Sequence, residues 1–143
     1  MRELCKHEIA QAQLERAVIL ALDNTDSISA VTLAGAADEI LGSLLRQQGR
    51  QTSYGGLGQL ISDIHGKIWK EKMNSAEFNE LANGIRNHFK HFRGSEKVRA
   101  DPAQEACNLI HRAISNYTSL GYERTQIMER WINESPHSPQ YDL

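Results

Sequence analysis

Apolar residues recur every three to four positions along most of the chain, which is the period of a helix with one buried face. The repeat predicts helices over about residues 3–22, 29–48, 57–73, 75–94 and 123–133, and a further helix that starts at Asp101. The longest regular stripe, in the second predicted helix, comprises Leu33, Ala37, Ile40, Leu41, Leu44 and Leu45. Together the stripes predict an all-α, up-down helical bundle of about five to six helices.

Residues that commonly start or stop helices support several of these boundaries. Asp101 precedes Pro102, and Gln104 stands where it can complete a capping box. Ser75 is a good N-cap for the fourth predicted helix, and Gly94 is a good C-terminal stop. These signals place the start of the helix after Asp101 more firmly than any other boundary.

We expect one helical bundle domain over residues 1–134 and a disordered tail over 135–143. The tail holds two of the three prolines and few apolar groups, so it can bury little surface. Valine is rare and no proline precedes Pro102, which favours helices over a sandwich or barrel. The run of small residues at 34–37 would let another helix approach closely.

A net charge of −2 and a pI near 6.3 exclude a bulk polycation of the histone type. The two cysteines, Cys5 and Cys107, are too few for a disulfide framework, and we interpret both as small buried apolar residues. The longest apolar run, residues 17–22, is far shorter than the roughly 18–20 residues that span a bilayer. We therefore expect a cytoplasmic protein without membrane contact.

The fourth predicted helix separates an apolar face from a polar one. With Ile85 at zero and about 100° per residue, the core face lies within about 60°. It comprises Phe78, Leu81, Ala82, Phe89 and Phe92. Arg86, Lys90, Asn87 and His91 follow near 100°, 140°, 200° and 240°. Residues 84–99 hold five Lys and Arg against one Glu, a local charge of +4 that suggests an anionic ligand, with phosphate the leading candidate.

The sequence Arg86-Asn87-His88-Phe89-Lys90-His91 resembles the R-x4-6-H signature of HEPN domains, in the form where a polar residue follows the Arg. This resemblance implies a helical bundle, often dimeric, and a metal-independent ribonuclease of the toxin–antitoxin, phage-defence or RNA-processing type. HEPN toxins that are neutralised by a nucleotidyltransferase carry a Tyr two residues past the His. Arg93 stands there, so regulation by adenylylation is not expected.

The residue types suit RNA cleavage by its own 2′-hydroxyl. His91 could act as the base and Arg86 as the phosphate clamp, while Asn87 could orient either the histidine or the phosphate. The expected RNA- and phosphate-binding residues are Lys90, Arg93, Lys97 and Arg99. We expect no metal and no cofactor, and we expect RNA, a second copy of the chain and possibly a cognate antitoxin as partners.

Two other functions stay open: a HEPN-like RNA- or nucleotide-binding module without catalysis, and a helical adaptor that docks a partner protein through its small-residue helix. The polar face could also be ordinary solvated surface.

Several single residues have a structural interpretation that we favour. His88 is expected to flank the core, and Trp131, like Trp69, to pack inside the bundle. His65 and His111 are expected on helix surfaces, and Asp38 and Glu39 in solvent, although the two acids could support a catalytic His.

Overall fold

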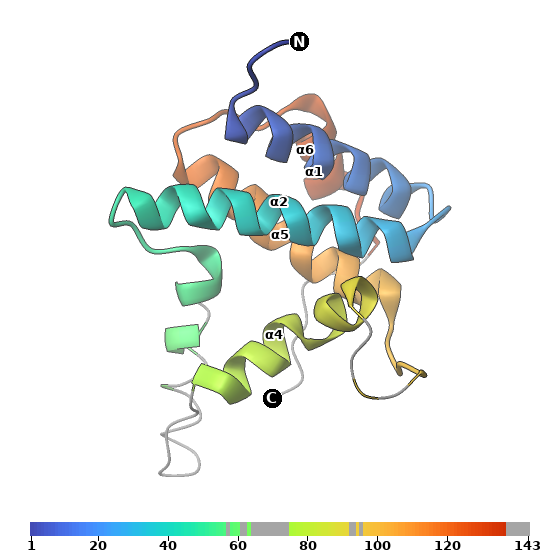
Figure 1. Ribbon diagram of the computed structural model, residues 1–143. Helices are drawn as coiled ribbons and strands as arrows, with labels where there is room; N and C mark the ends of the chain where they lie inside the picture. Colours follow the sequence, from blue (N-terminus) through green and yellow to red (C-terminus); the bar gives the residue numbers. More distant parts are fainter. Residues whose placement is uncertain (57, 61–62, 64–74, 92–93, 95, 137–143) are drawn as a thin grey trace.

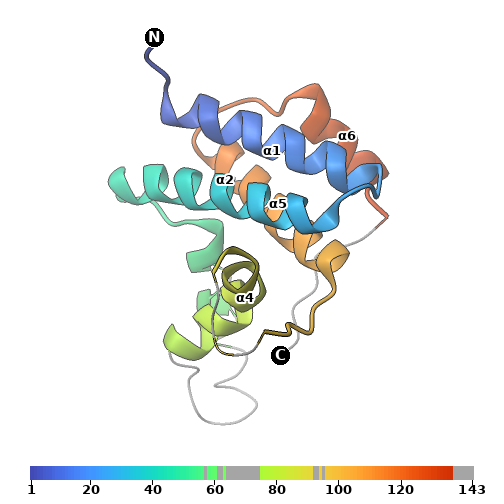
Figure 2. The ribbon, with the colours of Figure 1, turned by 45° about the vertical axis from the view of Figure 1, so that its right-hand side comes forward.

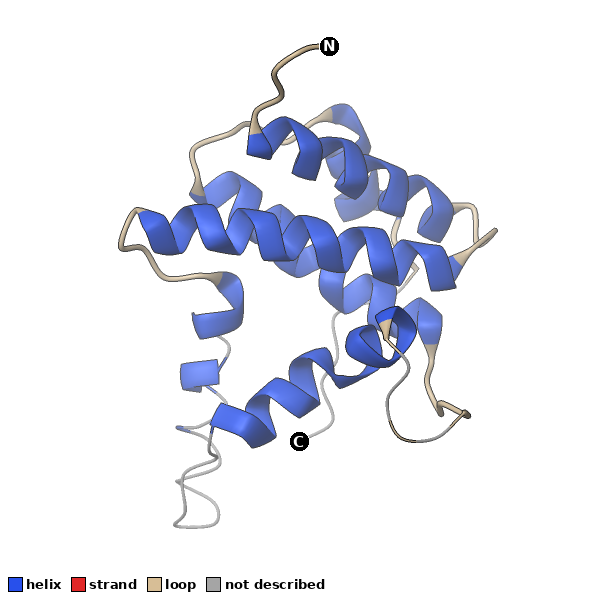
Figure 3. Ribbon diagram, in the orientation of Figure 1, coloured by secondary structure: helices blue, strands red, loops and turns tan. Residues whose placement is uncertain are grey.

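The computed structural model describes residues 1–56, 58–60, 63, 75–91, 94 and 96–136. These residues form helices and loops and contain no strand (Figure 1, Figure 3). The helices are α1 (Lys6–Leu22), α2 (Ser27–Gln47), α4 (Ser75–Lys90), α5 (Pro102–Ser119) and α6 (Gln126–Glu134). The predicted all-α helical bundle is therefore confirmed.

Helices α1 and α2 run antiparallel and are joined by a short turn, and α5 packs against α2 while α6 packs against α1 (Figures 1 and 2). Helix α4 lies on the other side of α2, away from α1 and α6. Helical backbone also covers residues 53–56 after α2. The predicted helix over 57–73 and the predicted tail fall mostly outside the described residues.

Hydrogen-bonding side chains explain two of the helix starts. The Oδ1 atom of Asp101 accepts hydrogen bonds from the backbone N–H groups of Ala103 and Gln104 at 3.1 and 3.2 Å, so the predicted start of α5 is confirmed. Helix α1 starts three residues later than predicted, because Cys5 is its N-cap and donates its backbone N–H to Glu8 Oε2 at 2.9 Å. Cys5 is consequently exposed, and the prediction that it is buried was wrong.

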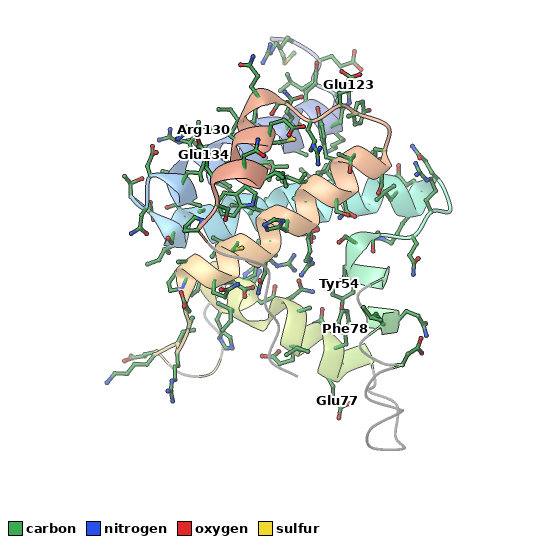
Figure 4. The ribbon with its side chains drawn as sticks, turned by 180° about the vertical axis from the view of Figure 1, so that it is seen from behind. Tyr54, Glu77, Phe78, Glu123, Arg130 and Glu134 are labelled. Atoms are coloured by element: carbon green, nitrogen blue, oxygen red, sulfur yellow. The ribbon has the colours of Figure 1, made fainter. Side chains whose placement is uncertain are left out.

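The main core lies between α1, α2, α5 and α6 and is built from small and branched apolar side chains. Its buried members include Leu14, Val31, Leu41, Ile110, Met128 and Trp131. Trp131 packs inside the bundle and Cys107 is buried, both as predicted. A separate small cluster joins Phe78 and Ala82 of α4 to Tyr54. Figure 4 shows Tyr54 beside Phe78, and their ring centroids are 4.7 Å apart.

The small-residue run of α2 receives α4 closely, as predicted. A Cβ atom on Gly35 would lie 2.4 Å from Cδ and 2.8 Å from Cγ of Arg86. Both distances are shorter than side chains tolerate, so only glycine leaves room for Arg86 to cross α2 at this level. The close approach fixes where the Arg86 stem lies.

By length and composition alone, α2 is the one helix of the described part that could cross a membrane, with a mean hydropathy of 1.4 over 18 residues. Half of that window is buried inside the fold, and a core helix passes the same test. The buried Asp38 in α2 is ion-paired with Arg112, as described below.

Candidate functional site: a polar pocket between α2, α4 and α5

A buried ion pair joins α2 to α5. Arg112 Nη2 lies 2.6 Å from Asp38 Oδ2, and only 4% and 5% of the two side chains are exposed. Arg112 also reaches α4, since Nη1 donates to the carbonyl of Ala82 at 3.0 Å and Nη2 donates to Asn83 Oδ1 at 3.2 Å. One guanidinium therefore binds three helices together. Asp38 was predicted to lie in solvent, and this was wrong because its helix position faces α5.

Asn116 of α5 extends this network. Its Nδ2 atom donates to Asp38 Oδ1 at 3.0 Å, and its Oδ1 atom accepts the backbone N–H of Ser53 at 2.7 Å. The next residue, Tyr54, places its ring 5.2 Å from the Arg112 guanidinium, within the range of a cation–π contact. The segment that follows α2 is thus held to α5 by directed polar contacts.

Burial and neighbouring cations shift the pKa values of the acids near this network in opposite directions. Burial raises the pKa of Asp38, and the guanidinium of Arg112, followed by those of Arg86 and Arg46, lowers it in part. The pKa of Glu105 is also raised by burial and partly lowered by Arg112 and Arg86. The arginines therefore act on acids of both α2 and α5.

Beside the network lies a pocket of about 160 Å³. Three arginines from three helices line it: Arg46 from α2, Arg86 from α4 and Arg112 from α5. Asn79 and Asn83 of α4 and Thr52 and Tyr54 from the segment after α2 contribute polar groups to the same wall. Two acids line it as well: Asp38, which is paired with Arg112, and the exposed Glu39. The three arginines therefore outnumber the two carboxylates by one.

The structure brings Arg86 and Asn87 together. Arg86 is partly buried against Gly35, and its Nη2 atom donates to Asn87 Oδ1 at 3.3 Å. His91 follows the last residue of α4, is exposed, and donates its backbone N–H to the carbonyl of Asn87 at 2.9 Å. His91 is not among the residues that line the pocket, so within one chain the two ends of the motif face different surroundings.

The remaining predicted binding residues lie outside the pocket. Lys90 Nζ is 4.0 Å from Glu39 Oε2, and both side chains are more than half exposed, so the solvated position expected for Glu39 is confirmed. Lys97 and Arg99 are exposed in the connection that leads to α5. Arg93 falls outside the described residues.

Two asparagines of the pocket are residues that the sequence interpretation overlooked. On the helical wheel with Ile85 at zero, Arg86 falls near 100°. Asn79 and Asn83 fall beside it, near 120° and 160°. With Arg86 and Lys90 they form a polar stripe at positions i, i+4, i+7 and i+11, which extends the predicted polar face toward the start of α4. Asn83 is nevertheless buried. The spacing alone could have marked the stripe as a contact surface for another polar helix.

Three other predicted residues are now placed. His88 is partly buried, as expected, and its buried Nδ1 atom has no hydrogen-bond partner in the described part of the chain. His111 is not on an open surface: its ring is half-buried against Trp131, with centroids 5.9 Å apart, and this burial lowers its pKa. Burial raises the pKa of the Cys107 thiol to about 11. Among the described residues, no three His, Cys, Asp or Glu side chains gather as a metal site would require.

Comparisons with protein-family models, with curated proteins and with solved structures gave no match.

Proposed function

We propose that the protein is a HEPN-like, metal-independent endoribonuclease that cleaves RNA at a site formed by Arg86, Asn87 and His91. The observation that carries the proposal is the arrangement at the end of α4. Arg86 and Asn87 are hydrogen-bonded to each other in the last turns, and an exposed His91 follows directly. A cation, an amide and a titratable imidazole thereby share one helix end, within the all-α bundle that the motif implies.

The proposed reaction needs only the RNA and these side chains. His91 removes the proton from a 2′-hydroxyl, and the resulting oxygen attacks the neighbouring phosphorus. Arg86 stabilises the negative charge that develops on the phosphate oxygens. The bond to the 5′-oxygen breaks, the leaving oxygen takes up a proton, and the products carry a 2′,3′-cyclic phosphate and a 5′-hydroxyl.

The directions of the two side chains favour a homodimer. On one helix Arg86 and His91 are separated by about 140° around the axis, so one chain does not direct both at the same point. Two copies of α4 that meet near a two-fold axis would place an Arg86 of one chain near a His91 of the other. Bound RNA would compensate the repulsion between the two basic segments, and the exposed Lys97 and Arg99 would extend the contact with it.

The test is cleavage of mixed RNA in EDTA by purified wild-type protein and by His91→Ala. We expect slow cleavage that leaves a 2′,3′-cyclic phosphate, and a loss of about 10²–10⁴-fold in the variant. His88→Ala, on the same helix, is the matched control and should change the rate much less. Circular dichroism verifies that all three proteins are folded. Equal cleavage by wild type and His91→Ala would refute the assignment.

Light scattering tests the composite site. We expect a mass of about twice the 16.1 kDa chain at micromolar concentration. A monomer at every concentration, together with undiminished cleavage, would exclude a site shared between two chains.

The separation of His91 from the pocket that holds Arg86 favours one alternative, an RNA- or nucleotide-binding module without catalysis. In that case wild type and His91→Ala would bind RNA alike and neither would cleave it, whereas Arg86→Ala would weaken binding.

A further inference from the structure

The polar pocket contains two guanidinium groups that form no ion pair with any carboxylate of the described residues. The charge of Arg112 is matched by Asp38, whose two oxygens already accept hydrogen bonds from Arg112 and Asn116. Arg46 donates to Ser43 Oγ at 2.9 Å, and among the described residues Arg86 donates to the Asn87 amide. Within the described part of the chain, neither Arg46 nor Arg86 has a carboxylate oxygen within 4.0 Å. Both nevertheless line the pocket.

The neutral side chains of the pocket also offer hydrogen-bond donors to a ligand. Thr52 Oγ1 accepts the backbone N–H of Gly55 at 2.9 Å, which leaves the hydroxyl hydrogen for another acceptor. Asn79 Oδ1 accepts from Tyr54 and Asn83 at 3.4 and 3.1 Å, so its Nδ2 group is the part that is left for a ligand. The buried Arg112 Nε has no acceptor in the described part of the chain. A pocket rich in hydrogen-bond donors favours a ligand that carries several hydrogen-bond acceptors.

The size of the pocket limits the ligand further. A cavity of about 150 Å³ accommodates a molecule as large as benzene, and a phosphate group is of similar size. We propose that this pocket binds a phosphate dianion, either free or as the terminal phosphate of a nucleotide, and that Arg46 and Arg86 hold it together with Thr52 and Asn79. Glu39 also lines the pocket, but its carboxylate lies 4.0 Å from Lys90 Nζ, so the charges of Arg46 and Arg86 are left to meet the two negative charges of the phosphate. The inference goes beyond RNA cleavage, because it needs neither a phosphodiester nor His91.

The experiment is isothermal titration calorimetry of the full chain at low ionic strength with inorganic phosphate, adenosine monophosphate and adenosine. Arg46→Gln removes one cation from an exposed position on α2, so the fold should be retained. Arg16→Gln, at an exposed position on α1, is the matched control. We expect Arg46→Gln to weaken phosphate binding by about tenfold or more, because a charge-assisted hydrogen bond is lost. Arg16→Gln should stay near wild type, and Arg46→Lys should lose less than Arg46→Gln.

The ligands separate the two sources of phosphate. Equal affinity for phosphate and adenosine monophosphate means that the group alone is recognised, and tighter binding of the nucleotide means that a nucleotide is the natural source. The inference is overturned if neither ligand binds wild type saturably, if adenosine binds as well as the nucleotide, or if Arg46→Gln and Arg16→Gln weaken binding equally. Absence of RNA cleavage by wild type would leave the inference intact, because phosphate binding is measured separately from cleavage.

Discussion

Helix α2 packs against α1 and against part of α5 through apolar side chains, whereas the junction of α2, α4 and α5 is built from charged and amide groups. The first contact is built from residues such as Leu14, Val31 and Ile110. The second depends on Asp38, Arg112 and the buried amides that surround them. Apolar burial is non-directional, but hydrogen bonds fix orientation. The helix that carries the candidate motif is therefore oriented in part by directed contacts, whereas α1 packs against α2 through apolar side chains.

Removal of one partner of the buried ion pair is the largest change that we predict on the polar side. Asp38→Ala and Arg112→Ala should each lower the free energy of unfolding by about 3–5 kcal/mol, because each leaves a buried charge without its partner. Urea denaturation measures the change. The double variant Asp38→Leu/Arg112→Met should be much less destabilised than the sum of the single changes. If the two losses simply add, the pair does not act as a unit.

Apolar truncation on the other side provides the comparison. Leu14→Ala should cost about 2–5 kcal/mol, through lost burial and the cavity that remains. This loss should not be recovered by a second truncation, since no charge is left unpaired. If a second substitution restores stability in the ion pair but not in the apolar core, the two contacts of α2 differ in kind.

The sequence predicts the apolar side well and the polar side poorly, for a physical reason. Periodic apolar residues report burial directly, so Ala37, Leu41 and Leu45 of the α2 stripe and Trp131 were placed correctly. A buried polar residue is stable only beside its partner, and the partner of Asp38, Arg112, is 74 positions away in the sequence. On the helical wheel Asp38 falls about 60° from Leu41 and Glu39 about 160°, so spacing places Asp38 nearer the buried face but does not reveal its partner. The start of α5 at Asp101 was predictable because the cap and the helix lie within four residues.

The crossing at Gly35 gives the next largest effect. Gly35→Ala should destabilise the protein by about 1–3 kcal/mol, since the new methyl group displaces the Arg86 stem. In an Arg86→Ala background the same change should stabilise it by roughly 0.5–1 kcal/mol, because alanine is the better residue inside a helix. Urea denaturation of the four proteins of this cycle measures the coupling. The same sign in both backgrounds would mean that Arg86 does not occupy the space above Gly35.

A smaller effect is expected from His111, which belongs to the apolar side. Burial lowers its pKa in the folded state, so the unfolded chain binds more protons below its ordinary pKa of about 6.5. The free energy of unfolding should therefore fall as the pH drops from 7.5 to 5. His111→Gln should reduce this fall, while the contribution of Glu105, whose raised pKa acts in the opposite sense, is common to both proteins. Identical pH profiles would contradict the burial of the imidazole.

The smallest effect should come from the residue beside Asp38. Glu39 forms an exposed pair with Lys90 at 4.0 Å, and exposed pairs contribute about 0–1 kcal/mol. Glu39→Gln should therefore change the free energy of unfolding by less than about 0.5 kcal/mol. The loss expected for Asp38→Ala, at the neighbouring position, is about 3–5 kcal/mol. The change removes a negative charge beside α4, so Lys90 becomes freer to contact a phosphate, and RNA affinity should rise slightly at low salt. Filter binding across a salt series measures this. Weaker RNA binding by Glu39→Gln would indicate that Lys90 needs its carboxylate partner to stay in position.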